Sequence, residues 1–223
     1  FVTADFTITK APLTIAANAG QSKVYGGTNP TSYAYTITGF VNGDLEADLD
    51  TPVSIARVDG ENVGNYTITP SVASDSNYDI AFVGGDFSIT EKVIRVTPDN
   101  GQFKEYQEND PASYAYTFLP ALEGNDQFTG DLSRASGENR GQYEIEIGNL
   151  SAGVNYDLVL DSGVNFEIKV ATPTIDFDNI TSDVITKIYG GADFYVTASS
   201  DFGADITYSI VGLTNGTTID ATT

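Results

Sequence analysis

Several residue types that commonly carry protein chemistry are missing from this sequence. Among its 223 residues there is no cysteine, histidine, tryptophan or methionine. Without cysteine and histidine the chain can form no disulfide, no thiolate or imidazole metal site and no catalytic pair with a histidine base. We therefore expect no enzymatic activity. Because a natural chain starts with methionine, we also expect this sequence to be a piece of a longer protein.

Basic residues are scarce and long apolar runs are missing. The chain has 10 Lys and Arg against 31 Asp and Glu, so its formal net charge is -21. Nucleic acid and anionic membrane faces would repel such a chain, so neither is an expected partner. The apolar runs are a few residues long, far below the roughly 18 needed to cross a bilayer. We expect no membrane insertion by this part and no signal peptide within it.

The residues that are abundant favour strands and turns. Hydrophobic residues make up 40% of the chain and aromatics 11%, which is enough for packed cores. Glycine is frequent at 22 residues, and Thr, Ser, Asn and Asp are common. This composition predicts an all-β protein.

The sequence contains an internal repeat. Three motifs occur twice: SYAYT at 32–36 and 113–117, GEN at 60–62 and 137–139, and NYD at 77–79 and 155–157. A fixed period indicates one structural unit copied along the chain. We predict two complete units, residues 11–91 (repeat 1) and residues 92–170 (repeat 2).

Fragments of the same pattern flank the two repeats. Residues 1–10 are similar to 82–90, the closing strand of repeat 1, and are predicted to close a preceding repeat. Residues 171–223 carry a third Tyr-Gly-Gly at 189–191 and then diverge. They are predicted to form a truncated Ig-like unit of a related subtype.

Apolar and polar residues alternate within each repeat. Tyr143 and Ile145 face one way while Glu144 and Glu146 face the other, as a half-buried strand requires. Such segments, separated by Gly, Asn, Asp and Pro turns, are typical of a small antiparallel sandwich. We predict about six to eight strands per repeat, joined by short connections that favour an elongated string of units.

The order of motifs resembles a known family. ITKAPLTI at 8–15, KVYGG at 23–27, NGD at 42–44, GENVG at 60–64 and DFSIT at 86–90 resemble the MBG repeat. In repeat 2 the double glycine is lost, because Tyr106-Gln107-Glu108 stands there. The resemblance covers nearly all of residues 1–170 and implies tandem Ig-like antiparallel β-sandwich repeats. It implies no catalytic residues.

The resemblance also implies a location and a role. MBG repeats occur in tandem in very large bacterial extracellular and adhesin-like proteins, so this chain is expected at a bacterial cell surface or secreted. The expected function is a structural stalk that projects a binding region from the cell, with neighbouring repeats as partners. The alternative is that the repeats themselves bind a surface glycan or protein.

The candidate metal site is an acidic stretch in repeat 1. Asp44, Glu46, Asp48 and Asp50 alternate along one segment, and hard cations such as calcium need several oxygen ligands. The competing interpretation is a solvated acidic loop. Asp176 and Asp178 are a weaker version of the same pattern, and no other cofactor is expected.

Other motifs have structural and functional interpretations. Tyr25-Gly26-Gly27 is predicted to form a turn, with a ligand-contacting loop as the alternative. Glu61 and Glu138 are predicted to be structural rather than catalytic. The four repeated tyrosines, Tyr33, Tyr35, Tyr114 and Tyr116, are predicted to pack in the core rather than to stack on sugar rings.

Overall fold

The computed structural model describes residues 4–177, 197–201 and 206, and its regular structure is almost entirely β-strand. Repeat 1 forms a sandwich of two sheets, with strand orders β3-β1-β6 and β2-β7-β5-β4. A short 3-10 helix, Glu46–Asp48, lies between β3 and β4. The strands are β1 (Ala11–Ala17), β2 (Gln21–Val24), β3 (Tyr35–Thr38), β4 (Ser54–Arg57), β5 (Gly64–Ser71), β6 (Tyr78–Val83) and β7 (Gly85–Thr90).

Repeat 2 has the same arrangement, with sheets β10-β8-β13 and β11-β12-β14-β9. Its strands are β8 (Lys92–Pro98), β9 (Phe103–Glu105), β10 (Tyr116–Leu119), β11 (Ser133–Arg134), β12 (Gly141–Glu146), β13 (Tyr156–Leu160) and β14 (Asn165–Lys169). Tyr35 pairs with the last residue of β1, and Tyr116 pairs with the last residue of β8. The predicted alignment of the two repeats is therefore confirmed, and so is the all-β fold.

The sheets of each sandwich contain parallel as well as antiparallel strand pairs. β1 pairs parallel with β6, and β2 pairs parallel with β7. The same parallel pairs join β8 to β13 and β9 to β14. The cause is that the first and last segments of a repeat each cross from one sheet to the other, at Asn18–Gly20 and at Gly84, while running in the same direction.

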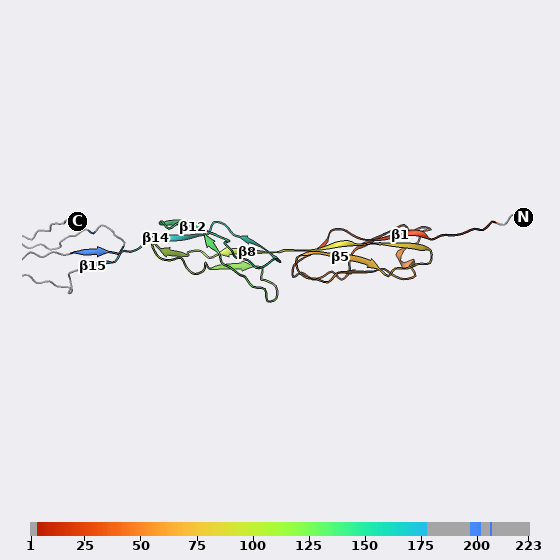
Figure 1. Ribbon diagram of the computed structural model, residues 1–223, viewed down its shortest axis with the longest axis horizontal. Coiled ribbons are helices and arrows are strands. Elements are labelled where there is room, and N and C mark those ends of the chain that lie inside the picture. Colours follow the sequence, from red (N-terminus) through yellow and green to blue (C-terminus); the bar gives the residue numbers. More distant parts are fainter. Residues whose placement is uncertain (1–3, 178–196, 202–205, 207–223) are drawn as a thin grey trace, which may run out of the picture.

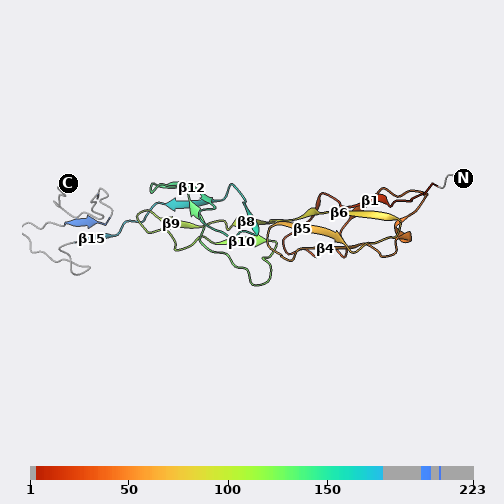
Figure 2. The same cartoon turned by 45° about the vertical axis from the view of Figure 1, so that its right-hand side comes forward.

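Parallel pairing of the first and last segments decides where a repeat begins and ends. Because both segments run from one end of the sandwich to the other, the chain enters at Ala11 and leaves at Thr90 on the opposite end. A single residue, Glu91, separates the last strand of repeat 1 from the first strand of repeat 2. The repeats consequently lie end to end, and both views of the ribbon show this elongated arrangement (Figures 1 and 2).

Each sandwich is held by alternating apolar residues that face inward. In repeat 1, Leu13 and Ile15 of β1 pack with Tyr78, while Ile68, Phe87 and Ile89 form a second cluster nearby. Repeat 2 has one continuous cluster. Its buried members are Ile94, Val96, Tyr114, Leu132, Ile145, Leu150, Ala152, Tyr156, Phe166 and Ile168.

The flanking segments are described only in part. Residues 4–10 form no strand, and the Phe6 and Ile8 side chains are exposed. β15 (Ile175–Phe177) pairs antiparallel with β16 (Ala198–Ser200). Most of the predicted third unit, including residues 189–191, lies outside the described residues, so its Ig-like fold and the role of residues 1–10 as a closing strand stay predictions.

Candidate functional site

The acidic stretch of repeat 1 uses its carboxylates in separate hydrogen bonds. Asp44 accepts a 2.7 Å bond from the Tyr78 hydroxyl, and Glu46 accepts one from the Tyr35 hydroxyl. Asp48 accepts from the backbone N–H of Leu45 at 2.8 Å. Asp50 accepts from the N–H of Ser76 at 2.9 Å. Asp44, Glu46 and Asp50 therefore fix the loop that contains the 3-10 helix to three different neighbours, and Asp48 caps the helix within the loop.

The carboxylates do not converge on one point. Within the described residues, no group of three or more Asp or Glu side chains is close enough to hold a metal ion. Asp176 lies in β15 and Asp178 is outside the described range. Calcium binding by these residues stays a prediction, and the geometry gives the acids of repeat 1 a structural use.

The Gly-Glu-Asn motif carries an ion-pair cluster in each repeat. In repeat 1, Glu61 pairs with Arg57 at 2.8 Å and with Lys23, and it accepts a 2.9 Å hydrogen bond from Asn29. The Arg57 side chain also donates to the Tyr33 hydroxyl at 3.2 Å. These contacts join the end of β2, the end of β4 and the loops that follow these two strands.

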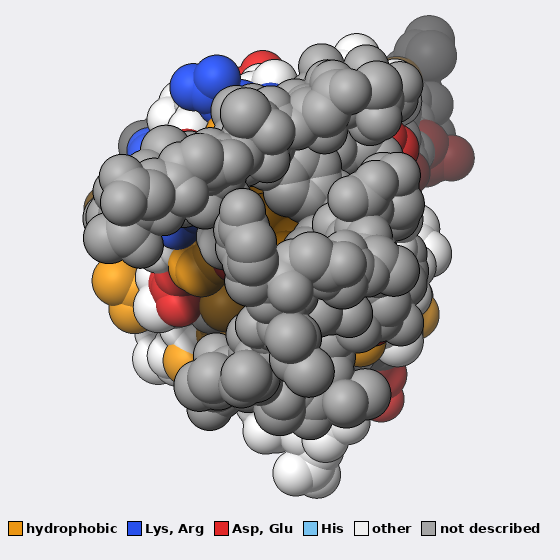
Figure 3. Space-filling model, turned by 90° about the vertical axis from the view of Figure 1, so that its left-hand side faces the viewer, with side chains coloured by type: hydrophobic (Ala, Val, Ile, Leu, Met, Phe, Trp, Pro, Cys, Tyr) orange, Lys and Arg blue, Asp and Glu red, His pale blue; other side chains and the backbone are white. Residues whose placement is uncertain are grey.

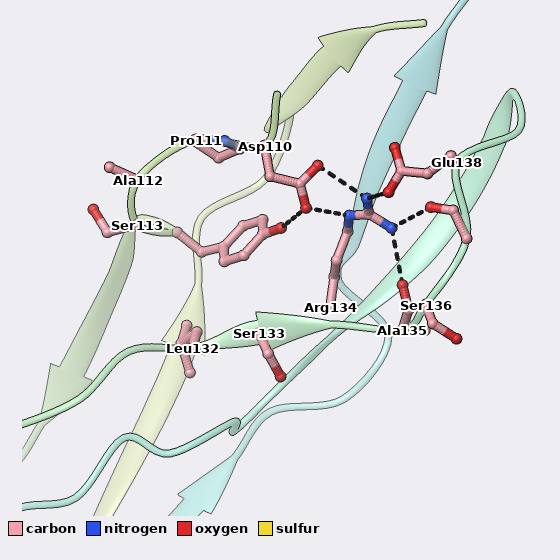
Figure 4. A pocket seen from close by; sticks show the side chains of 12 residues that line it. Asp110, Pro111, Ala112, Ser113, Leu132, Ser133, Arg134, Ala135, Ser136 and Glu138 are labelled. Atoms are coloured by element: carbon pink, nitrogen blue, oxygen red, sulfur yellow. Dashed lines mark hydrogen bonds and ion pairs between the residues drawn. The ribbon is translucent and has the colours of Figure 1, made fainter. Parts of the chain in front are cut away.

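The equivalent cluster of repeat 2 contains one more acid. Arg134 binds Asp110 through two nitrogens at 2.8 and 2.9 Å and Glu138 at 2.7 Å (Figure 4). Lys104, only 5% exposed, pairs with Asp110 at 2.7 Å and with Glu138. The Tyr114 hydroxyl donates to Asp110 at 2.9 Å. Asp110 stands where repeat 1 has Asn29, so it adds a second carboxylate beside the arginine.

Both arginines lie over aromatic rings. The Arg57 guanidinium carbon is 4.7 Å from the Tyr66 ring centre and 5.2 Å from that of Phe87. Arg134 is placed in the same way over the rings of Tyr143 and Phe166. Cation–π attraction and ion pairing therefore act on the same guanidinium group.

These contacts shift the pKa of the acids downward. Hydrogen bonds from Lys23 and then Asn29 lower the pKa of Glu61 to about 2. The pKa of Glu138 is lowered by Lys104 and Arg134. That of Asp110 is lowered most by Arg134. All three acids are therefore charged at neutral pH and act as ion-pair partners, in agreement with the structural interpretation of the Gly-Glu-Asn motif.

A shallow depression of about 430 Å³ covers the cluster of repeat 2. Its lining comes from the loop residues 110–114 and from residues 132–138, which contain β11, and the paired side chains of Asp110, Arg134 and Glu138 occupy one end (Figure 4). The basic groups here are already paired with carboxylates. This arrangement favours cohesion of the loops over binding of a charged ligand.

The repeated tyrosines pack inside the repeats, as predicted. The Tyr33 ring meets Phe87 edge-on at 5.5 Å between ring centres, and Tyr114 meets Phe166 at 5.3 Å. Tyr35 and Tyr116 are partly buried against the same cores. Their faces are therefore not presented as a platform for sugar rings.

The Tyr-Gly-Gly turn of repeat 1 reaches into repeat 2. The backbone N–H of Tyr25 donates to the carbonyl of Thr90, which fixes the turn at the exit end of repeat 1. The Tyr25 ring packs edge-on against Tyr156 at 5.3 Å between centres. Both phenols donate to the same carboxylate oxygen of Asp126, at 2.9 Å from Tyr25 and 2.7 Å from Tyr156.

A second set of contacts crosses the joint beside the tyrosines. The Asn155 side chain accepts a 2.9 Å bond from the N–H of Val63 and donates one of 3.1 Å to Asn62. Within repeat 2, Lys92, the first residue of β8, pairs with Glu123 and donates to the Ala121 carbonyl at 2.8 Å, which holds the loop that faces the joint. The joint is therefore a packed and hydrogen-bonded contact between the turns of repeat 1 and the loops of repeat 2.

The tyrosine pKa values report the same contact. Burial and then the Asp126 carboxylate raise the pKa of Tyr156 to about 12. The hydrogen bond to Asp126 is the main cause that raises the pKa of Tyr25. The two phenols therefore hold their protons, and the shared carboxylate keeps its charge, over the neutral range.

Sequence reasoning gave Tyr25-Gly26-Gly27 as a turn, and the turn is confirmed by the φ of +75° at Gly26. The contact of this turn with repeat 2 was missed. A signal was available, because the motif follows the strand that pairs with the last strand of the repeat, but that pairing was not predicted. Lys23, Arg57, Lys104 and Arg134 were also missed, although each basic residue recurs at the matching place of the other repeat.

The fold and the packed joint together place the chain in the class of proteins built from tandem β-sandwich repeats stacked end to end. A family model described as MBG domain (YGX type) matches residues 13–88 and 94–166. The two matches cover more than half of the sequence, and the chain belongs to the MBG domain family. A comparison with curated proteins gave no match.

Proposed function

We propose that these repeats are structural spacers in the stalk of a large bacterial cell-surface adhesin, where they hold a binding region away from the cell. The observation that carries this proposal is the entry and exit of the chain at opposite ends of each sandwich, with the joint between repeats filled by Tyr25, Asp126 and Tyr156. Each added repeat then adds length in one direction. No chemical step is needed for such a role.

The surface charge supports a spacer that stays apart from its copies. The net charge of -21 is large for a chain of this size. Seen along the long axis, acidic side chains appear on several sides of the described surface, while Lys and Arg gather on one side (Figure 3). Repulsion between like-charged stalks opposes lateral clumping at low ionic strength.

The decisive experiment separates a spacer from a binding module. The 223-residue chain is presented to a glycan array and to surface proteins of candidate host cells, with the complete parent protein as the positive control. A spacer gives binding by the parent and none by the chain. Saturable binding of the chain to one glycan or protein would instead support the alternative of an adhesive repeat.

The proposed location has a separate test. Antibodies against residues 11–170 should label intact cells of the source bacterium or its culture medium without permeabilisation. Label that appears only after permeabilisation would contradict an extracellular stalk.

A further inference from the structure

The exit ends of the two repeats have the same backbone conformation but differ in sequence. Tyr25 donates its N–H to Thr90, and Tyr106 donates its N–H to Lys169 in the same way. The next residue has a φ of +75° at Gly26 and +69° at Gln107. Gln107 therefore adopts the left-handed conformation of the glycine while carrying a side chain, at some cost in backbone strain.

The joint leaves no room for a side chain at the equivalent position of repeat 1, Gly26. A Cβ atom on Gly26 would overlap the side chain of Glu123 in repeat 2. Glu123 is not free to swing away at no cost, because it pairs with Lys92, which also binds the carbonyl of Ala121. Glycine is needed here for the close approach of the two repeats, and it also adopts the positive φ of the turn without strain.

The connections after the two repeats also differ. Only Glu91 separates β7 from β8, whereas residues 170–174 separate β14 from β15. Tyr106 is 38% exposed, whereas Tyr25 is partly buried and packs against the core of repeat 2. The exit of repeat 2 thus combines a longer connection with a turn that lacks the glycine.

We propose that Tyr25-Gly26-Gly27 is a docking element for the entry end of the following MBG repeat. Its partner surface consists of Glu123, Asp126, Asn155 and Tyr156. The Tyr25 ring packs on Tyr156, and the Tyr25 hydroxyl donates to Asp126. Gly26 has no side chain, which leaves room for the side chain of Glu123. Tyr106-Gln107-Glu108 does not present this element, so the exit of repeat 2 does not dock a following unit in this way.

This inference concerns how consecutive repeats recognise each other, and it goes beyond the proposed stalk. It holds whether the repeats are spacers or binding modules. If the two repeats are docked and the chain binds glycans, only the spacer function is refuted. If the repeats are not docked and the chain binds no ligand, only the docking proposal is refuted.

The test measures the distance distribution between the two repeats in the full 223-residue chain. Since the chain has no cysteine, Ser54→Cys and Glu144→Cys introduce two unique labelling sites on exposed strand positions. Nitroxide labels and pulsed electron resonance then give the width of the distribution. We expect one narrow peak for the parent chain and loss of that narrow peak in G26Q and Y25A.

Matched variants separate docking from strain and from unfolding. Gly20 has a φ of +77° and nothing within 4 Å of an added Cβ, so G20Q carries the same backbone strain without the overlap. Y106A removes the equivalent tyrosine at the other exit. Both controls should keep the narrow peak, and circular dichroism should show folded chains throughout.

Two results would overturn the proposal. One is a narrow peak that survives both G26Q and Y25A. The other is equal broadening by G20Q or Y106A, which would mean that strain or a general loosening sets the angle between the repeats. If Y25A unfolds repeat 1, G26Q still decides the matter, because Gln107 shows that glutamine is accommodated at this turn position.

Discussion

The tyrosines at 66 and 143 explain why the Gly-Glu-Asn motif begins with glycine. The Tyr66 hydroxyl donates to the carbonyl of Asn62 at 2.7 Å, and Tyr143 donates to Asn139 at the same distance. The ring then lies directly over the glycine, where a Cβ on Gly137 would overlap the Tyr143 ring. This motif is therefore a packing requirement of the turn rather than a sign of acid catalysis.

Replacing Gly137 should be costly for that reason. Its φ of +143° is unfavourable for residues with a Cβ, and the overlap with Tyr143 adds to the strain. We expect Gly137→Ala to lower the free energy of unfolding by about 2 kcal/mol or more. Urea unfolding measures this loss. Gly163→Ala has a φ of +87° in open space and should cost less, so equal losses would contradict the role given to the ring.

The ion pairs of Glu61 predict an acid-sensitive stability. Its pKa falls from 4.5 to about 2 in the folded chain because Lys23 and Asn29 donate hydrogen bonds to the carboxylate. A carboxyl with a lowered folded pKa stabilises the fold above its unfolded pKa, and this stabilisation is lost as pH falls through the folded value. We expect the urea midpoint to drop between about pH 4.5 and pH 2.

Glu61→Gln should make that drop shallower, because the neutral amide does not titrate. Glu144→Gln, on an exposed face of β12, is the control and should leave the pH profile unchanged. An E61Q profile that matches the parent chain would show that these ion pairs contribute nothing to acid stability.

Period-2 alternation at the level of strands predicted the inward faces well. Ile94 and Val96 of β8 are fully buried, while Val93, the residue before Ile94, is 53% exposed. Alternation is the same in parallel and antiparallel pairs, so it could not reveal that β8 lies parallel to β13. The ion-pair clusters and the joint were also out of reach, because they depend on which loops the mixed pairing brings together.

A pair of substitutions in β8 tests which face is buried. Removing buried methyl groups costs transfer free energy and leaves a cavity, so Ile94→Ala should lower the free energy of unfolding by about 2–5 kcal/mol. Val93→Ala, one residue away on the exposed face, should change it by no more than about 0.5 kcal/mol. Urea unfolding compares the two variants. Similar losses for both would contradict the burial of one face only, and a larger loss for Val93→Ala would place the opposite face inward.

Two physical effects can keep the chain extended, and measurements at low and high salt distinguish them. Repulsion within a chain of net charge -21 is one reason, and the parallel topology with its packed joint is the other. A compact chain of this length would have a radius of gyration of about 17 Å. We expect small-angle scattering to give a value well above this, because each repeat begins and ends on opposite ends.

Screening removes the first reason and leaves the second. The Debye length falls from about 30 Å at 0.01 M salt to about 3 Å at 1 M, so repulsion between repeats is lost at the higher concentration. Ring packing of Tyr25 on Tyr156 and the hydrogen bonds of Asn155 do not depend on long-range charge. The radius of gyration should therefore stay well above the compact value across this range. Contraction toward about 17 Å at 1 M salt would show that charge, rather than topology and the joint, keeps the chain extended.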